Sequence, residues 1–251
     1  VNPETIYLNQ FINYTKNGKF KGLNNAKLKK FGELQKFYPG VPEIFEKTKH
    51  LIEGNETYKA YDIKLEHYIV STGLTEVIKG SKIMPYVEGV WGCEFIETKD
   101  SDGNNIIGEI GYTIDNTTKT RALFEINKGV GKQEGIMVNT RLPEDLRRVH
   151  FINMVYVADG PSDIPAFSVV NQNGGATFAI YPPGNKDAMK QVEQMRIDNR
   201  INMYAEADYS ENKTAYMWLC NKITEFADRI VKEQKDRLSK YAAVAQPKHL
   251  T

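Results

Sequence analysis

The sequence has few cysteines, no excess of charge of either sign and no long hydrophobic run. Its two cysteines, Cys93 and Cys220, lie far apart and fit no metal-binding spacing. Reduced thiols of a cytoplasmic protein are therefore expected, not a disulfide framework. Lysine and arginine total 33 against 32 aspartate and glutamate residues, which argues against a generic nucleic-acid or membrane surface. No apolar run is long enough to cross a bilayer, and no secretory signal begins the chain.

The 251 residues suffice for one large domain, or for a core with a smaller lobe, and such a chain buries a core without disulfides. The first residue is Val1 and not methionine, so we expect further residues upstream.

The hydrophobic pattern predicts strands that alternate with helices. Strands are expected over 65–70, 90–96, 106–114, 151–158 and 176–181, the last of the clear strands. Helices are expected over 41–52, from Leu74, over 119–128, and in a helical region from Lys186 that includes a long helix of about 213–240. Residues 1–38 indicate short helices and loops, and the tail from Ala245 shows no sign of order. This alternation indicates an α/β fold with a mostly parallel sheet.

Two carboxylates follow the predicted strand 151–158. Asp159 ends the strand, a Gly-Pro turn follows, and Asp163 comes four positions later. The carboxyl end of a strand is where α/β proteins bind ligands, and two close carboxylates repel each other unless a cation is near. A bound Mg²⁺ ion would offset this repulsion between the two carboxylates. An ordinary turn is the alternative, because Asp, Gly, Pro and Ser all favour turns.

The predicted strand 65–70 leads into Ser71, Thr72 and Gly73. A hydroxyl at a strand end, followed by a tight turn into a helix, presents a side chain and free amides to an anion such as phosphate. The alternative is that Ser71 or Thr72 only caps the following helix.

Lys119 lies in the first turn of the predicted helix 119–128. A cation there opposes the helix dipole, which makes sense if Lys119 points at a phosphate or at a carboxylate nucleophile. A solvated lysine is the alternative. Arg121 and Lys128 are weaker candidates of the same kind.

In this order, the three elements resemble the motifs of the haloacid dehalogenase-like hydrolase superfamily, on its phosphoserine-phosphatase-like side. Ser71 matches the second motif, Lys119 the third, and Asp159 with Asp163 the fourth. The resemblance implies a Rossmann-like three-layer core over 39–184, a partial helical cap over 1–38 and a helical C-terminal extension over 185–251.

The chain departs from this family in one respect. The first motif, an apolar strand followed by Asp-x-Asp-x-Thr, is absent. Asp100-Ser101-Asp102 has the spacing but reads as a solvated turn. We expect that the first motif lies upstream of Val1, which leaves a sheet edge or gap beside 65–70 and 151–158. The alternative is a member that has lost catalysis.

The resemblance implies a Mg²⁺-dependent phosphatase that acts on a small phosphomonoester through an aspartyl-phosphate. Ser71, with the amides of Thr72 and Gly73, would orient the phosphate, and Lys119 would neutralise charge. Asp159 would bind Mg²⁺, while Asp163 would hold the metal shell or Lys119. The substrate itself is not predicted.

A non-catalytic module is the alternative of a different class. The predicted C-terminal helix carries an apolar stripe of Ile223, Phe226, Ala227, Ile230 and Val231. An exposed stripe would favour a protein partner, and a buried one would not.

Overall fold

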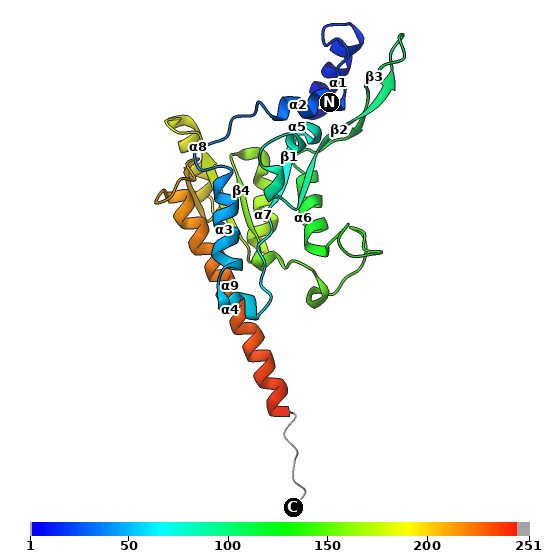
Figure 1. Cartoon of the computed structure of the whole chain (residues 1–251). Coiled ribbons are helices and arrows are strands. Elements are labelled where there is room, and N and C mark those ends of the chain that lie inside the picture. Colours follow the sequence, from blue (N-terminus) through cyan, green and yellow to red (C-terminus); the bar gives the residue numbers. More distant parts are fainter. Residues whose placement is uncertain (1, 245–251) are drawn as a thin grey trace, which may run out of the picture.

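Two three-stranded sheets with helices around them make up the fold (Figure 1). The computed structural model describes residues 2–244; Val1 and 245–251, including the tail expected to lack order, lie outside the described residues. The helices are α1 (Pro3–Lys16), α2 (Asn25–Gly32), α3 (Glu43–Glu53), α4 (Glu56–Ala60), α5 (Thr75–Lys79), α6 (Thr118–Lys128), α7 (Ile164–Gln172), α8 (Lys186–Ile197) and α9 (Thr214–Val244). The strands are β1 (Tyr68–Leu74), β2 (Gly89–Lys99), β3 (Asn105–Tyr112), β4 (Val155–Ala158), β5 (Ala176–Tyr181) and β6 (Met203–Glu206).

One sheet is mixed and the other is parallel. In the first, β1 and β2 are parallel, and β2 and β3 form an antiparallel hairpin. In the second, β4, β5 and β6 are parallel in that order. The expectation of an α/β fold is therefore confirmed.

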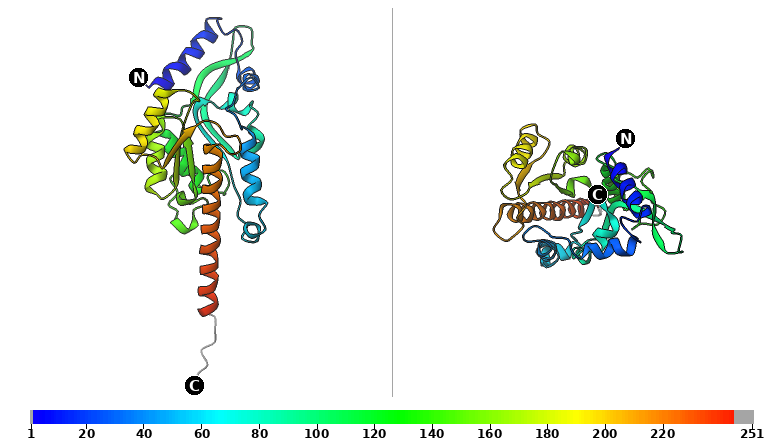
Figure 2. Two further views of the ribbon diagram at one scale, coloured as in Figure 1. Left: turned by 90° about the vertical axis from the view of Figure 1, so that its left-hand side faces the viewer. Right: turned by 90° about the horizontal axis from the view of Figure 1, so that it is seen from above.

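Helices cover both faces of the parallel sheet. Alternate residues of a strand point to opposite faces. Tyr156 of β4 and Ala179 of β5 contribute to a cluster with α6, α7 and α8. Val155 faces a cluster with α3 and α9, and the β5 residue Phe178 packs against the start of α9. Figure 2 shows α8 and α9 on opposite sides of these strands.

The N-terminal helices pack on the β2–β3 hairpin. Leu8 and Ile12 of α1 and Leu28 of α2 are buried against Cys93 of β2 and Ile107 of β3. In Figures 1 and 2, α1 and this hairpin lie at the end of the molecule away from the C-terminal half of α9. The prediction of short helices over 1–38 is confirmed, while the domain boundaries at 38 and 184 stay predictions.

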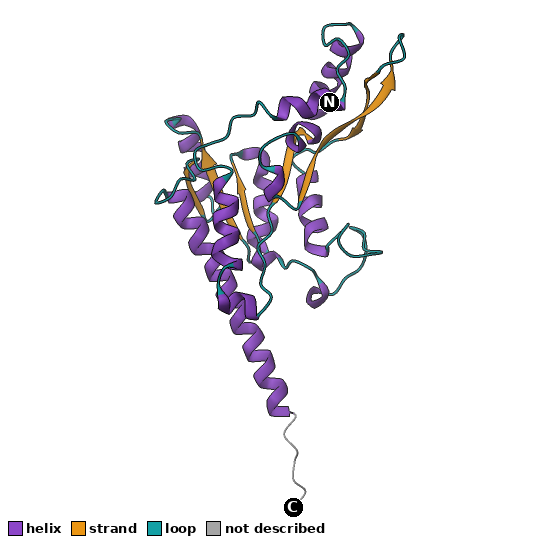
Figure 3. Cartoon of the chain, viewed as in Figure 1, coloured by secondary structure: helices purple, strands orange, loops and turns teal. Residues whose placement is uncertain are grey.

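Strands β1 and β4 are both edge strands. Among the described residues, β1 pairs with β2 and β4 with β5, and each keeps a second edge without a strand partner (Figure 3). Both contribute to one hydrophobic cluster, through Tyr68 and Val70 of β1 and Tyr156 and Ala158 of β4. The expected sheet edge beside 65–70 and 151–158 is therefore present.

Three predicted elements differ from the structure. Phe151–Asn153 forms a 3₁₀ turn and not the start of the strand, because the amide of Met154 bonds to the carbonyl of Phe151. The helix expected from Leu74 is the five-residue α5. The region after Lys186, expected to be helical, contains the additional strand β6.

The long helix α9 is confirmed, and its apolar stripe is buried. Ile223, Phe226, Ala227 and Val231 lie in the core, and Ile230 is partly buried against it. This removes the observation on which a partner-binding C-terminal helix depended. Both cysteines are free. No helix within 2–244 has the length and apolar composition needed to cross a membrane.

Replacing Phe167 by alanine tests the core between α7 and the parallel sheet. Phe167 is 0% exposed and contacts Tyr156 edge-on at 5.3 Å between ring centroids. We expect Phe167→Ala to lower the free energy of unfolding by about 3–5 kcal/mol in chemical denaturation, since it leaves a cavity. Leu238→Ala, at a position 63% exposed, should change it by about 0.5 kcal/mol or less. Equal effects would contradict this packing.

Candidate functional site

A buried ion pair joins the first turn of α6 to the segment before α7. The Nζ atom of Lys119 lies 2.7 Å from Oδ1 of Asp163, and the two side chains are 7% and 4% exposed. The alternative of a solvated Lys119 is therefore wrong. Asp163 holds Lys119, which is one of the two roles that the resemblance implied for Asp163. Helix α6 begins one residue earlier than predicted.

Two further hydroxyl groups complete the surroundings of Asp163. Tyr156 Oη donates to Asp163 Oδ1 at 2.5 Å, and Ser162 Oγ donates to Oδ2 at 3.0 Å. Burial and the adjacent carboxylate of Asp163 raise the pKa of Tyr156 well above its usual value, so its hydroxyl keeps its proton. Both carboxylate oxygens are thus engaged, and Asp163 holds Lys119 in place.

Asp159 stands apart from this pair. It follows the last residue of β4, at the carboxyl end of the parallel sheet, and its side chain is exposed. Within the described part of the chain it makes no hydrogen bond or ion pair. The alternative of an ordinary turn holds in part, because Pro161–Asp163 forms a 3₁₀ turn. This turn places the Asp163 carboxylate in ion-pair contact with Lys119.

Ser71, Thr72 and Gly73 form a bulge inside β1. The strand pairs with β2 at Val70 and again at Leu74, and its register shifts between them. Ser71 Oγ accepts a hydrogen bond from the amide of Gly73 at 3.0 Å. Neither Ser71 nor Thr72 caps α5, whose N-cap is Leu74 without a side-chain bond, so the capping alternative is wrong. The expected support from a helix dipole is small, because α5 has five residues.

The weaker candidates do not contribute to this group. Arg121 is exposed and pairs with Glu125, with its Nε 2.9 Å from Oε1. Lys128 lies at the other end of α6 and donates to the carbonyls of Val138 and Thr140. Asp100 accepts bonds from two amides of the β2–β3 turn, as expected for a solvated turn.

The sequence reasoning missed two tyrosines. Tyr156 lies on the same face of β4 as Ala158, and its aromatic ring suggested only a core position. Tyr209 lies in the segment between β6 and α9. Its amide donates to the carbonyl of Pro39 at 2.7 Å. Burial raises the pKa of Tyr209, and the nearby Tyr38 and Asp159 raise it further.

No cluster of three or more His, Cys, Asp or Glu side chains suited to a metal occurs among residues 2–244. Of the expected site residues, the structure brings Lys119 and Asp163 into direct contact. Asp159 follows β4 and Ser71 lies in the bulge of β1, and neither makes a hydrogen bond or ion pair to Lys119 among the described residues.

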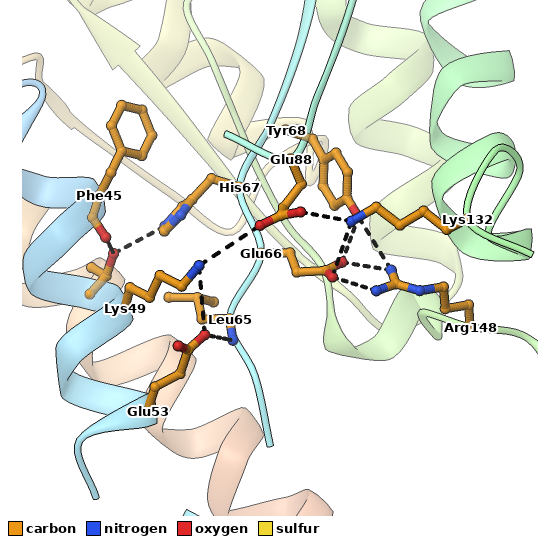
Figure 4. Close-up of polar contacts among 11 residues, drawn as sticks. Phe45, Lys49, Glu53, Leu65, Glu66, His67, Tyr68, Glu88, Lys132 and Arg148 are labelled. Atoms are coloured by element: carbon orange, nitrogen blue, oxygen red, sulfur yellow. Dashed lines mark hydrogen bonds and ion pairs between the residues drawn. The ribbon is translucent and has the colours of Figure 1, made fainter. Parts of the chain in front are cut away.

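A second polar cluster lies at the opposite, amino-terminal end of β1 (Figure 4). Arg148 binds the Glu66 carboxylate with both of its terminal nitrogens, and Tyr68 Oη donates to Glu66 at 2.5 Å. Lys132 bridges Glu66 and Glu88. These bonds tie the loop 129–150 to the start of β1, so we assign the cluster a structural role.

His67 connects this cluster to α3. The ring of His67 packs edge-on against Phe45, with its Nε2 3.1 Å from Thr48 Oγ1. Burial lowers the pKa of His67 to about 4, so the imidazole is neutral at pH 7. A neutral, packed His67 supports the structural role that we assign to the cluster around Glu66.

The chain is similar to a protein of Borreliella burgdorferi that carries the description "Uncharacterized protein". The two are 36% identical over 236 residues, which cover 89% of this chain and 79% of that protein. About a fifth of that protein lies outside the match. No family model matches the chain, and no solved structure matches it.

Removing one member of the buried pair tests its geometry. Lys119→Met leaves Asp163 buried without its cation, and we expect it to lower the free energy of unfolding by about 3–5 kcal/mol. The double variant Lys119→Met, Asp163→Leu should recover most of this loss, since both charges are gone. Arg121→Met, which breaks an exposed pair, should leave stability close to the parent protein. A Lys119→Met effect no larger than that of Arg121→Met would contradict a buried pair.

The second polar cluster predicts a dependence of stability on pH. Arg148 holds the pKa of Glu66 at about 2, below the ordinary 4.5, with Tyr68 and Lys132 adding to the effect. The unfolded chain therefore takes up this proton first as the pH falls. The contribution of Glu66 is present above pH about 4.5 and is lost between there and pH 2.

In chemical denaturation between pH 5 and 2.5, Glu66→Gln should lose stability less steeply with falling pH than the parent protein. Glu134→Gln, at an exposed position, serves as the matched control. An unchanged slope in Glu66→Gln would show that the Arg148 pair does not form.

Proposed function

The chain belongs to the same family as the Borreliella burgdorferi protein, and we propose that it supplies the phosphate- and Mg²⁺-binding part of a haloacid dehalogenase-like phosphomonoester hydrolase. In this proposal the phosphate is bound by Ser71, Thr72, Gly73 and Lys119, and Mg²⁺ is bound by Asp159. Asp163 fixes Lys119. The nucleophilic aspartate belongs to a further strand that the 251 residues do not contain.

The buried position of Lys119 carries the proposal. Burying a lysine is expensive unless its charge is used, and apolar residues of similar volume would stabilise the fold as well or better. Its partner Asp163 lies four residues after Asp159, at the carboxyl end of β4. A cation fixed by Asp163, and a carboxylate at the end of β4 that has no other partner among the described residues, would together suit a ligand that bears both phosphate and Mg²⁺.

The two free edges support a further strand between β1 and β4. Both strands share one hydrophobic cluster, and α6 and α7 contact each other over it. A strand paired with both would join the two sheets into one, in the order β6-β5-β4-new-β1-β2-β3. That arrangement is the Rossmann-like core that the resemblance implies, with α1 and α2 as the partial cap. The carboxyl end of the new strand would lie between Ser71 and Asp159.

The residues present fit Mg²⁺ in part. Mg²⁺ is commonly bound by one or two carboxylates, with water and phosphate oxygens completing its octahedron. Asp159 offers one exposed carboxylate without another partner among the described residues. The nucleophilic aspartate of the further strand would offer the second. Bound Mg²⁺ would offset the repulsion between that carboxylate and the phosphate.

The chain's own groups would act by charge and position. By the resemblance, the first aspartate of the missing motif would attack phosphorus, and the second aspartate of that motif would protonate the leaving alkoxide to give the alcohol. Water, deprotonated by the same second aspartate, would then hydrolyse the aspartyl-phosphate to phosphate and the free carboxylate. Lys119 would neutralise charge on the phosphoryl group, and its bond to Asp163 fixes the position of the ammonium. Ser71 and the amides of its bulge orient the phosphate oxygens. We propose a small-molecule phosphomonoester as substrate and the reducing cytoplasm as location, which suits the two free cysteines.

The second candidate is a catalytically inactive member that binds phosphate or metal. The same Lys119–Asp163 pair supports it, because binding needs no nucleophile. A version that acts through a protein partner on α9 has lost its support, since the stripe on that helix is buried.

Turnover of a generic phosphate monoester in the presence of Mg²⁺ tests the proposal. We expect no turnover by the 251-residue chain, which lacks a nucleophile, and turnover by a version extended upstream through the first motif. In the extended version, Asp159→Asn should lower kcat/KM by roughly 100-fold or more, because the metal loses a ligand. Asp100→Asn, in the β2–β3 turn, should leave kcat/KM unchanged.

Turnover by the 251-residue chain that survives Asp159→Asn would sink the proposal. An extended version that binds phosphate but hydrolyses nothing would favour the inactive member.

A further inference from the structure

Tyr7 of helix α1 and the N-cap residue Asn2 donate hydrogen bonds to two segments next to the proposed phosphate-binding groups. These segments are the bulge of β1, which contains Ser71, and the turn at Asp115, which precedes α6 and Lys119. They are separate in the sequence and reach the site from different elements. Their spacing decides whether one phosphate can contact both.

The first bond fixes the bulge. Tyr7 Oη donates to the carbonyl of Thr72 at 2.6 Å, across 65 positions of sequence. Cys93 Sγ lies 3.3 Å from the same oxygen. A carbonyl in a bulge lacks a regular ladder partner, so these two donors define the direction of the peptide between Thr72 and Gly73. Burial raises the pKa of the Tyr7 hydroxyl, which keeps the proton that it donates.

The second bond fixes the start of α6. Asn2 caps α1 by accepting from the amides of Glu4 and Thr5, and its Nδ2 donates to Asp115 Oδ2 at 3.1 Å. The other carboxylate oxygen of Asp115 accepts from the amides of Thr117 and Thr118, at 2.9 and 2.7 Å. Asp115 thus holds the turn immediately before Lys119.

Packing makes α1 a firm support for these bonds. Leu8 is 0% exposed and Ile12 is 6% exposed, and both are buried in a cluster with Cys93 and Ile114. Tyr7 and Leu8 are adjacent, so the buried side chain of Leu8 limits the movement of Tyr7.

We propose that α1 is a positioning element of the phosphate site and that Tyr7 is its principal positioning residue. Tyr7 sets the orientation of the Ser71–Gly73 bulge, and Asn2 sets the start of α6, so that one helix fixes both sides of the bound phosphate. Tyr7 does not touch the phosphate. This inference rests on the proposed function, because it takes Ser71 and Lys119 as the phosphate-binding groups.

The test is the affinity of the 251-residue chain for inorganic phosphate with Mg²⁺, measured by ³¹P NMR titration at a temperature where every variant is folded. Tyr7→Phe removes the hydroxyl and keeps the ring. We expect it to raise the phosphate Kd about three- to tenfold, the effect of one hydrogen bond. Asn2→Ala should also raise the phosphate Kd. The matched control is Tyr14→Phe on the same helix, whose hydroxyl makes no hydrogen bond within residues 2–244. Its Kd should not change.

Ser71→Ala separates this inference from the function on which it rests. If Ser71→Ala and Tyr7→Phe both weaken binding while Tyr14→Phe does not, α1 positions the site. If Ser71→Ala weakens binding and neither Tyr7→Phe nor Asn2→Ala does, the inference is wrong and the proposed function stands. If neither the 251-residue chain nor the version extended upstream binds phosphate, or if Ser71→Ala has no effect on binding, the proposed function is wrong and the inference is overturned with it. If Tyr7 had a purely structural role, Tyr7→Phe would lower the unfolding temperature and leave the phosphate Kd unchanged.

Discussion

A buried ion pair between Lys119 and Asp163 is the interaction on which the account of this protein depends. It joins the start of α6, which lies over β1, to the start of α7, which lies over β4 and β5. The pair therefore connects the helices that cover two separate sheets. Two buried charges are stable only with good geometry and satisfied oxygens, and Tyr156 and Ser162 satisfy those of Asp163. The pair therefore links the two sheets at the proposed phosphate site, in addition to the hydrophobic cluster that they share.

The two sheets that the Lys119–Asp163 pair connects each have a free edge, at β1 and at β4. An edge strand with unpaired backbone groups favours addition of another strand. Here two such edges belong to one hydrophobic cluster. A strand that paired with both would satisfy two rows of backbone groups, and in the proposed function it would bring the nucleophilic carboxylate between Ser71 and Asp159. Completion of the sheet and completion of the site would then be one event.

Local patterns predicted much of this fold, and tertiary contacts decided the rest. Strand 176–181 and the helix at 119–128 have strong periodicity and appear where expected. Strand β6 was missed because Met203–Glu206 has only four residues, and pairing with β5 makes it a strand. The contact of Lys119 with Asp163 was one of two stated possibilities, since sequence spacing cannot show which carboxylate a lysine meets across 44 positions. The sequence did not predict the hydrogen bonds of Tyr7 and Asn2, because single polar residues at such positions are usually solvated.

Hydrogen exchange at the backbone amides of β1 and β4 tests the central claim most directly. It would be measured for the 251-residue chain and for a version extended upstream through the first motif. The account predicts that amides on the free edges of both strands exchange faster in the short chain than the paired amides of β5, and that both edges become protected together in the extended protein. Equal protection in the short chain, or protection of neither edge or only one on extension, would contradict it.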